Sequence, residues 1–336
     1  MSNKLYENPV FICGHRKTGT TLLLCLLDNH PELLVYPPDS VFFYGYYPKY
    51  DSDEYSADDK INRMLEYVLH QIEYEVKILP EDFQKEINFP FDKFKNDFKA
   101  LALKTDLKPK DMLKCLFESY RMNWNGSPEA KLCVEKTSST EIYANEIIKW
   151  FPNAKFIHII RDPRDNWASL KSGWEKRYKD FNDELNRLMQ SMIERGRLGL
   201  EMGKNNLEFF GDEVYKIIRY EDLTENPEAI LKQLCEFLNI SYHSSLEIPT
   251  VCGQLWKGNN FDGLTFNKPS NINVGKWRER ITTQEAQLLE FYFTDIMNHF
   301  GYETAFPISE RLNMATQHYK WFNFIQLYSG STATPE

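Results

Sequence analysis

Short apolar runs alternate with longer helical patterns along most of the chain. Five runs have the length of a buried strand and read NPVFICG, PELLVY, KLCVEKT, AKFIHIIRDP and EVYKIIRYEDL. Patterns with apolar residues at helical spacing follow three of them, in TTLLLCLLDNH, PRDNWASLKSGW and NPEAILKQLCEFLNI. Short buried strands that alternate with helices indicate an α/β fold, with a central parallel β-sheet and crossover helices on both faces.

Three other segments depart from this alternation. Residues 47–129 are rich in charge and in helical periodicity, so we expect a helical insertion that forms a lid or side wall within a single domain. Residues 245–275 contain many Gly, Asn and Pro residues and predict a long loop. A helix over TTQEAQLLEFYFTDIMNHFGY should end at Gly301, and residues 329–336 predict a flexible tail.

The composition narrows the range of partners. The 336 residues carry a formal net charge of −9, which argues against nucleic acid or an anionic membrane surface but allows a local basic pocket for a small anion. The six cysteines have no C-x-x-C spacing, which favours reduced thiols in a cytoplasmic protein over disulfides or a zinc site. No secretory signal is expected, and the longest apolar stretch, TLLLCLL, is too short for a transmembrane segment.

The segment CGHRKTGTT, after the first predicted strand, has the glycine spacing of a phosphate-binding loop. Gly14 and Gly19 are placed as in G-x-x-x-x-G-K-[ST], but Lys17 precedes the second glycine instead of following it. Backbone N–H groups in a glycine turn ahead of a helix bind anions readily. The alternative is an ordinary strand-to-helix turn capped by threonine.

Lys17 favours the anion site, because its ammonium group would lie beside the terminal group of a bound phosphate ester and stabilise charge on a leaving group. A nucleotide triphosphatase also needs Mg²⁺, held in part by an acidic residue that ends another strand. The third and fourth predicted strands end in Glu135-Lys136 and Arg161 instead. The sequence therefore predicts anion chemistry without a metal.

A second candidate anion site follows the fourth predicted strand. Arg161 comes just after the carboxyl end of that strand, where ligands of open α/β sheets bind, and Ser169 lies about two turns along the next helix. Both could contact one phosphate. The alternative is that Arg161 pairs with Asp162 or Asp165 as a structural ion pair.

Two anion sites at one sheet edge suggest a nucleotide with phosphates at both ends of its ribose. The two segments resemble the 5′-phosphosulfate and 3′-phosphate motifs of the sulfotransferase family, which uses 3′-phosphoadenosine 5′-phosphosulfate (PAPS). The resemblance extends to EKTSSTEIYANEIIKWFPNAKFIHIIRDPRDNWAS, to YEDLTENPEAILKQLCEFLNI and to VGKWRERIT, in the order of the family, from about Pro9 to Glu290. It implies a P-loop-like fold related to nucleotide kinases, and no metal.

The resemblance also assigns roles to individual residues. Lys17 would stabilise the leaving 5′-phosphate and the transferring sulfuryl group, while Arg161 and Ser169 would bind the 3′-phosphate. The loop residues that match the family pattern or adjoin it are expected to hold the donor: Arg16, Lys17, Thr18, Gly19, Thr20 and Thr21.

Four further positions have two interpretations each. Asp39, in YPPDSVFF, is the candidate base that takes the acceptor's proton, or a turn residue after two prolines. Lys136 contacts the donor or pairs with Glu135. Trp277 closes over the nucleotide or fixes its loop to the core. His158, within the fourth strand, is expected to be a buried histidine with satisfied hydrogen bonds.

The aromatic run VFFYGYYPKY suits the mouth of a pocket for sugar rings or apolar alcohols, although core packing accounts better for most of it. Together these features predict a sulfotransferase that acts on a hydroxyl or amine of a small-molecule, carbohydrate or lipid-like acceptor. The alternatives are a metal-dependent nucleotide kinase of related fold and a non-catalytic nucleotide-binding protein.

Overall fold

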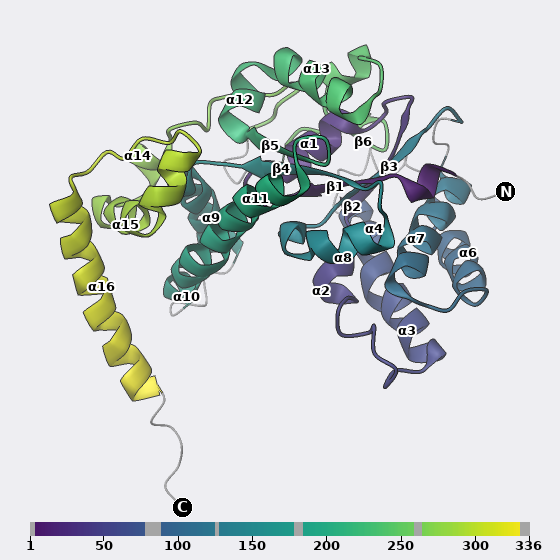
Figure 1. The fold of residues 1–336 in the computed structure, drawn as a ribbon, viewed down its shortest axis with the longest axis horizontal. Coiled ribbons are helices and arrows are strands. Elements are labelled where there is room, and N and C mark those ends of the chain that lie inside the picture. Colours follow the sequence, from purple (N-terminus) through teal and green to yellow (C-terminus); the bar gives the residue numbers. More distant parts are fainter. Residues whose placement is uncertain (1–3, 78–88, 125–127, 178–183, 259–263, 330–336) are drawn as a thin grey trace, which may run out of the picture. The chain divides into compact units, whose positions relative to one another are not determined.

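Five parallel strands form the sheet of the computed structural model, which describes residues 4–77, 89–124, 128–177, 184–258 and 264–329. The strand order is β2-β3-β1-β4-β5 (Figure 1). Each strand overlaps one of the five predicted apolar runs, which confirms those predictions, although β2 continues past PELLVY to Asp39. The strands are β1 (Pro9–Cys13), β2 (Leu33–Asp39), β3 (Leu132–Lys136), β4 (Lys155–Ile160) and β5 (Tyr215–Arg219).

The chain divides into two compact units. The sheet unit comprises residues 1–160 and 202–271, and the helical unit comprises residues 161–201 and 272–336. In the sheet unit, β1 pairs with β3 on one side and with β4 on the other, while the chain leaves β1 and β4 toward opposite edges. The carboxyl ends of β1 and β4 therefore form a topological switch point, where ligands of such sheets usually bind.

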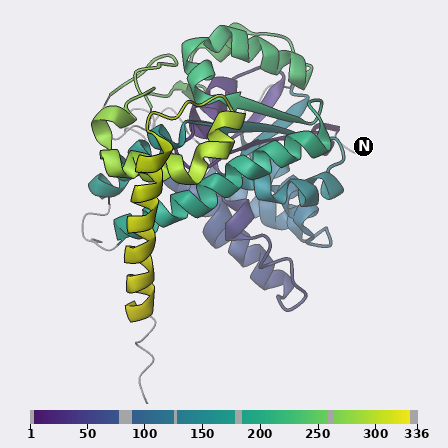
Figure 2. The same cartoon turned by 60° about the vertical axis from the view of Figure 1, so that its left-hand side comes forward.

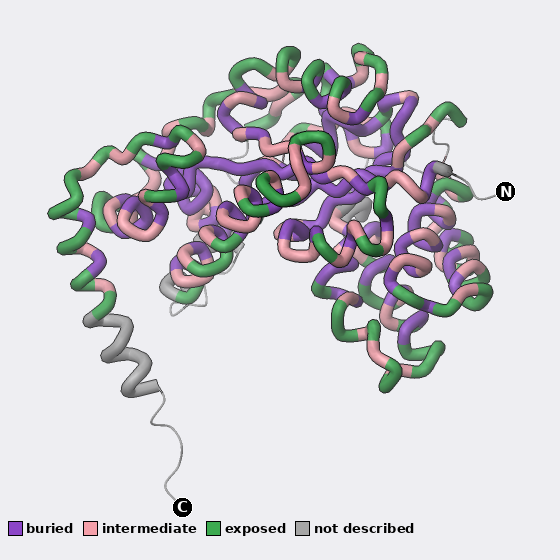
Figure 3. The backbone as a smooth tube through the Cα atoms, in the orientation of Figure 1, coloured by how far each residue is buried: buried purple, intermediate pink, exposed green. Residues whose placement is uncertain are grey.

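Each face of the sheet packs against its own group of helices. On one face, Val10 and Ile12 pack with the leucines of α1 (Thr20–Leu27) and α13 (Pro227–Leu238), and α13 lies over the strands in Figure 2. On the other face, Phe11 and Phe156 pack with α8 (Ala144–Trp150) and with the helical insertion. The strands are the most continuously buried part of the sheet unit (Figure 3).

The helical insertion is confirmed by the described residues, which exclude 78–88 and 125–127. A capping box between Ser56 and Asp59 begins its first long segment. The preceding aromatic run is mainly core, as expected, because Phe42, Phe43 and Tyr46 are fully buried. The elements are α2 (Phe42–Gly45), α3 (Ala57–Arg63), η2 (Met64–Val68), α4 (Leu69–Lys77), α6 (Phe91–Ala102) and α7 (Pro109–Asn123).

The expected long loop contains more regular structure than its composition suggested. Asp28 accepts hydrogen bonds from Thr250 Oγ1 at 2.7 Å and from Gly253 N at 2.8 Å, which holds a short hairpin beside α1. The other elements of the sheet unit are η1 (Lys4–Glu7), η3 (Thr140–Tyr143), α12 (Tyr220–Glu225), η5 (Ser244–Glu247), β6 (Thr250–Val251) and β7 (Gln254–Leu255).

The helical unit contains the predicted C-terminal helix and also helices that were not predicted, among them those at residues 184–191 and 308–329. Thr282 and Glu285 form a capping box at the start of α15, and Gly301, at φ 74°, follows its end. The sequence patterns gave no indication of α16; the predicted tail falls on residues 330–336, outside the described residues, apart from Ser329. The elements are α9 (Pro163–Arg177), α10 (Glu184–Ser191), η4 (Met192–Gly196), α11 (Arg197–Phe210, which continues into the sheet unit), α14 (Trp277–Arg280), α15 (Thr283–His299) and α16 (Ile308–Ser329).

Two further expectations can be compared with the structure. All six cysteines lie in the described part of the chain, and all are buried free thiols, as predicted. Of the helices that the structure describes, none has the length and apolar character needed to cross a membrane.

Candidate active site

The loop between β1 and α1 is closely packed at both of its glycines. Gly14 has φ 135°, and a Cβ atom there would lie 2.3 Å from the carbonyl oxygen of Ile159 in β4. Gly19 has φ 111°, and a Cβ atom there would lie 2.5 Å from the ring of Tyr220. Both positions therefore require glycine, because a side chain would have neither the backbone conformation nor the space.

The turn within this loop has the shape of an anion-binding backbone. Lys17 adopts a left-handed conformation at φ 67°, and Thr18 donates to the carbonyl oxygen of His15 from both its backbone nitrogen (3.2 Å) and its hydroxyl (2.7 Å). Turns of this kind direct successive N–H groups into one concavity, and the start of α1 adds its own N–H groups. Arg16 is exposed, Lys17 and Thr21 are partly exposed, and Thr18 and Thr20 are buried.

A second segment supports the loop from inside the protein. The Ser139 N–H donates to the Gly14 carbonyl at 2.9 Å, and the Gly14 N–H donates to Oε2 of Glu141 at 3.0 Å. Glu141 is fully buried, and this burial raises its pKa to about 7. The sequence analysis missed Glu141, because a glutamate at the start of a helical turn is ordinarily exposed to solvent.

Asp39 and Lys136 lie at the carboxyl ends of neighbouring strands. The strand register pairs the two residues, and Lys136 Nζ lies 3.1 Å from Asp39 Oδ2. The Asp39 side chain is 27% exposed and that of Lys136 is 7% exposed, so the carboxylate is the more accessible partner. Lys136 thus pairs with Asp39 and not with Glu135, the partner considered from sequence.

Glu135 is instead held by hydroxyl groups. Its Oε1 accepts hydrogen bonds from Ser40 and from Thr137, the latter at 2.6 Å, and burial raises the pKa of this carboxyl to about 7. His158 is fully enclosed: its Nδ1 lies 2.8 Å from the Tyr215 hydroxyl, and burial lowers its pKa to about 3. The prediction of a satisfied, buried histidine is confirmed.

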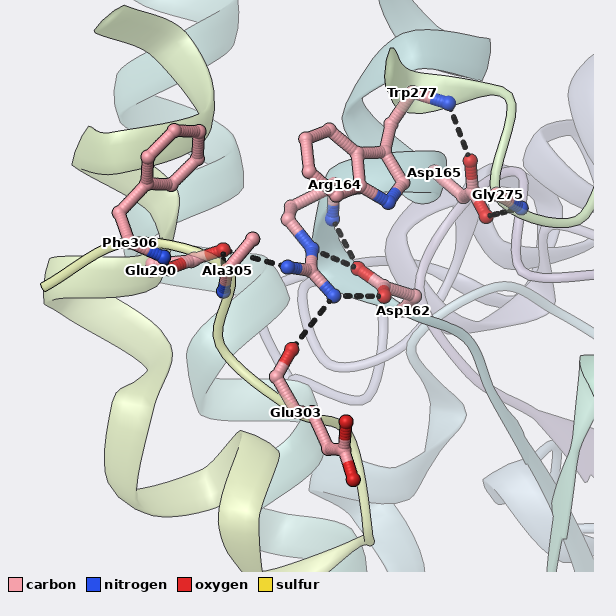
Figure 4. A network of polar contacts seen from close by, with 9 residues as sticks. All are labelled: Asp162, Arg164, Asp165, Gly275, Trp277, Glu290, Glu303, Ala305 and Phe306. Carbon is pink, nitrogen blue, oxygen red and sulfur yellow. Dashed lines mark hydrogen bonds and ion pairs between the residues drawn. The ribbon is translucent and has the colours of Figure 1, made fainter. Parts of the chain in front are cut away.

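The helical unit begins with the segment that carries the second predicted anion site. Arg161 donates to the carbonyl oxygen of Asn273 at 2.9 Å. Asp165 accepts from the backbone N–H groups of Gly275 (2.6 Å) and Trp277 (2.7 Å), so it organises the turn before α14 (Figure 4). Ser169 lies in α9 and is partly exposed.

Arg164 is the centre of the polar network in Figure 4. It donates to Asp162 at 2.6 Å, to Glu290 at 2.5 Å and to the carbonyl oxygen of Glu303 at 3.0 Å. Burial alone would lower its pKa, but the bonds to Asp162 and Glu290 raise it on balance. Asp162 thus bonds to Arg164, and Asp165 bonds to the turn at 275–277. Burial raises the pKa of Asp165, and the nearby charge of Arg161 opposes this rise.

Trp277 contacts two guanidinium groups. The guanidinium carbons of Arg164 and Arg278 each lie 4.4 Å from its ring centroid, and the side chain is only 5% exposed. These contacts fix its loop to the helical unit, as one of the two sequence interpretations expected. Contact between Trp277 and a nucleotide stays a prediction.

The comparison with known protein families decides the family. The model of the sulfotransferase family matches residues 9–244, which include the phosphate loop, Asp39, Lys136, Arg161 and Ser169. The chain belongs to the sulfotransferase family. The family resemblance inferred from the sequence is thereby confirmed.

Two curated relatives share low sequence identity with this chain. The protein-tyrosine sulfotransferase of Drosophila melanogaster is 20% identical over 70% of this chain, and the match spans 39% of the fly protein. The omega-hydroxy-beta-dihydromenaquinone-9 sulfotransferase Stf3 of Mycobacterium bovis is 22% identical over 92% of this chain and 79% of its own length.

Solved structures agree on the fold of this chain. The sulfotransferase domain from the curacin biosynthetic pathway aligns with a TM-score of 0.54 and 18% identity over 89% of this chain and 99% of that chain. The sulfotransferase domain from the Synechococcus PCC 7002 olefin synthase has the same TM-score and identity, over 89% of this chain and 97% of its own. The predicted α/β fold with a P-loop-like turn is thus confirmed, while the roles of individual residues stay predictions.

Proposed function

We propose that this protein transfers a sulfuryl group from PAPS to an acceptor hydroxyl or amine. The observation that carries the proposal is the loop at residues 14–19, whose two glycines and left-handed Lys17 form an anion-binding turn at the switch point of the sheet. A phosphosulfate bound there would meet backbone N–H groups, the start of α1 and the Lys17 ammonium group.

Lys17 would act on the bond that breaks. In an in-line displacement, the acceptor atom forms a bond to sulfur while the bond between sulfur and the bridging oxygen of the 5′-phosphate breaks, and the electron pair leaves with 3′,5′-bisphosphoadenosine. Lys17 would stabilise the negative charge that develops on that oxygen. We propose that this lysine and the backbone N–H groups replace the metal ion that phosphoryl transfer requires, because a sulfuryl group carries less negative charge.

Asp39 is our candidate for the base that takes the acceptor's proton. Its carboxylate is partly exposed at the end of β2, and Lys136 and the Val41 N–H (3.2 Å) hold it in place. We propose that Arg161 and Ser169 bind the 3′-phosphate of the donor, supported by the family motif and by the position of Arg161 directly after β4. Trp277 would then cover the nucleotide from its loop.

We propose a chemical class of acceptor, without naming a particular molecule. The names of both relatives specify acceptors that carry a hydroxyl group, one a tyrosine in protein and one a lipid-like menaquinone derivative. In this chain Tyr44 is 48% exposed, and its hydroxyl donates to the carbonyl oxygen of Ser139, next to the loop. An aromatic side chain at this position suits a small-molecule, carbohydrate or lipid-like acceptor with an apolar surface.

Thermal unfolding with added nucleotides tests the donor first. We expect 3′,5′-bisphosphoadenosine to raise the unfolding temperature more than ATP with Mg²⁺, because the sites at residues 14–19 and 161–169 would each bind a phosphate. A preference for ATP with Mg²⁺ would contradict the proposal and favour a kinase.

Transfer of labelled sulfate from PAPS to panels of phenols, sugars, lipid alcohols and amines then tests the reaction. We expect transfer that persists in the presence of EDTA. Nucleotide binding without transfer to any class would support a non-catalytic binding protein instead.

A further inference from the structure

Gly14 is held at both of its backbone polar groups by one short segment, Ser139–Glu141. Ser139 donates to its carbonyl, and Glu141 accepts from its N–H. Glu141 is itself anchored, because the buried side chain of Asn206 in α11 donates to the Glu141 carbonyl oxygen at 2.9 Å. The phosphate loop thus depends on a carboxyl group whose position is fixed from two sides.

The second oxygen of this carboxyl is not hydrogen-bonded to any described residue. Glu141 Oε1 is buried and makes no hydrogen bond within the described part of the chain. A buried carboxylate with one unsatisfied oxygen is unfavourable, whereas a neutral carboxylic acid still accepts from Gly14 through its carbonyl oxygen. Burial accordingly raises the pKa of Glu141 to about 7.

The groups that face Glu141 from the sheet keep one protonation state near neutral pH. Burial raises the pKa values of Cys13 in β1 and Tyr215 in β5 well above their ordinary ranges, and His158 in β4, which contacts Tyr215, has a pKa of about 3. The titratable or charged groups on the loop side are His15, Arg16 and Lys17.

We propose that Glu141 is a positioning residue for donor binding, which fixes the loop through Gly14 when it is neutral and weakens anion binding when it is charged. The inference rests on the proposed function, because the anion concerned is the 5′-phosphate group of the donor. A carboxylate directly behind Gly14 repels an anion in the loop, and the low dielectric of the interior screens this repulsion poorly. Anion binding therefore favours the protonated form of Glu141, and proton uptake and donor binding are coupled.

The test compares Glu141→Gln and Glu141→Ala with the wild-type protein. Glutamine retains an oxygen acceptor for the Gly14 N–H and cannot become charged, whereas alanine removes the acceptor. Dissociation constants are measured at pH 6, 7 and 8.5 for 3′,5′-bisphosphoadenosine and, in parallel, for sulfate, which is a dianion over this whole range. The dissociation constant of the wild-type protein is divided by that of the variant at each pH. This ratio removes the pH effects that both proteins share, such as any from His15 or from the nucleotide phosphates.

For Glu141→Gln, we expect a ratio near one at pH 6 that increases with pH, so that the variant binds more tightly than the wild-type protein at pH 8.5. Linkage limits the increase to about 30-fold at pH 8.5 for a group with a pKa of about 7. Glu141→Ala should bind about tenfold more weakly than Glu141→Gln at every pH, since both variants lack the charge but only alanine also removes the anchor of the loop. If the alanine variant does not fold, the glutamine ratio alone decides.

Glu135→Gln is the matched control, because Glu135 is equally buried and has a similar pKa but bonds to hydroxyl groups instead of the loop. Its ratio should not change with pH. A ratio for Glu141→Gln that is constant with pH, or equal pH dependence in both glutamine variants, would overturn the inference. Sulfate binding with the expected ratio but no nucleotide binding would reject only the proposed function, and absence of binding by both anions to the wild-type protein would overturn both.

Discussion

The two units bury acidic groups with different partners. In the helical unit, Glu290 is fully buried and accepts from Arg164 at 2.5 Å and from the backbone N–H groups of Ala305 (2.8 Å) and Phe306 (3.1 Å). In the sheet unit, Glu135 and Glu141 are equally buried but accept only from hydroxyl or backbone N–H groups among the hydrogen bonds that the structure describes. Their pKa values are both raised to about 7.

The difference separates two uses of a buried carboxyl. A carboxylate bonded to a guanidinium group and to two N–H groups is a fixed structural charge, because neither partner titrates near neutral pH. A carboxyl bonded only to neutral hydroxyl or N–H groups, with its pKa raised to about 7 by burial, gains or loses a proton near neutral pH. Removing the arginine partner of a buried carboxylate should therefore destabilise the helical unit. Replacing a buried carboxyl of the sheet unit by an uncharged group should instead stabilise that unit.

The largest effect on stability is expected for Arg164→Met. This change removes the cation from Asp162 and Glu290 and leaves both carboxylates buried, so the free energy of unfolding should fall by about 3 to 5 kcal/mol. Chemical denaturation measures the change. Arg197→Met is the matched control in the same unit, because its partner Asp295 is 69% exposed, and it should cost under about 1 kcal/mol. Equal losses in the two variants would contradict the distinction between buried and exposed pairs.

Lys17→Ala tests a cation to which we assign a catalytic role, in contrast to the structural role of Arg164. Turnover with an acceptor found in the screen should fall about 100- to 1000-fold, as when a group that stabilises transition-state charge is lost. Affinity for 3′,5′-bisphosphoadenosine and the free energy of unfolding should change much less, in contrast to Arg164→Met. Lys17→Arg should recover part of the turnover. Unchanged turnover in Lys17→Ala would remove this residue from the mechanism.

Much of the sheet unit could be predicted from sequence because its signals are local. A strand, a glycine turn and a helix start follow one another between Pro9 and Leu27, and the positive φ angles at Gly14 and Gly19 are ones that glycine adopts readily. The Arg164 network could not be predicted, since Arg164 bonds to Glu290 and Glu303, which lie 126 and 139 positions further along the sequence. RDPRD contains two arginines and two aspartates, and only the packing of α15 against α9 selects Arg164 as the partner of Glu290.

Gly14→Ala tests whether the loop depends on backbone geometry. The added Cβ meets the Ile159 carbonyl at 2.3 Å and requires φ near 135°, so we expect a loss of about 3 kcal/mol in the free energy of unfolding, together with loss of nucleotide binding. Gly211→Ala separates backbone strain from steric overlap, because Gly211 has φ 78° but nothing within 4 Å of an added Cβ. It should cost about 1 to 2 kcal/mol and leave nucleotide affinity intact. Loss of affinity in both variants would assign the effect to general destabilisation.

Glu135→Gln and Glu290→Gln should change stability in opposite directions at pH 8. The folded-state pKa of Glu135 lies above its ordinary value of 4.5, so the folded state binds the proton more tightly and the wild-type free energy of unfolding should fall as pH rises from 5 to 8, by roughly 2 kcal/mol for this group. Glutamine keeps an acceptor for Ser40 and Thr137 but has no charge to bury, so Glu135→Gln should be more stable than the wild-type protein at pH 8 and should reduce this slope. Glu290→Gln should be less stable, because Arg164 loses part of its counter-charge in the interior. Urea denaturation at pH 5, 6.5 and 8 measures both variants, and a change of the same sign in both at pH 8 would mean that the two units do not differ in how they neutralise buried acids.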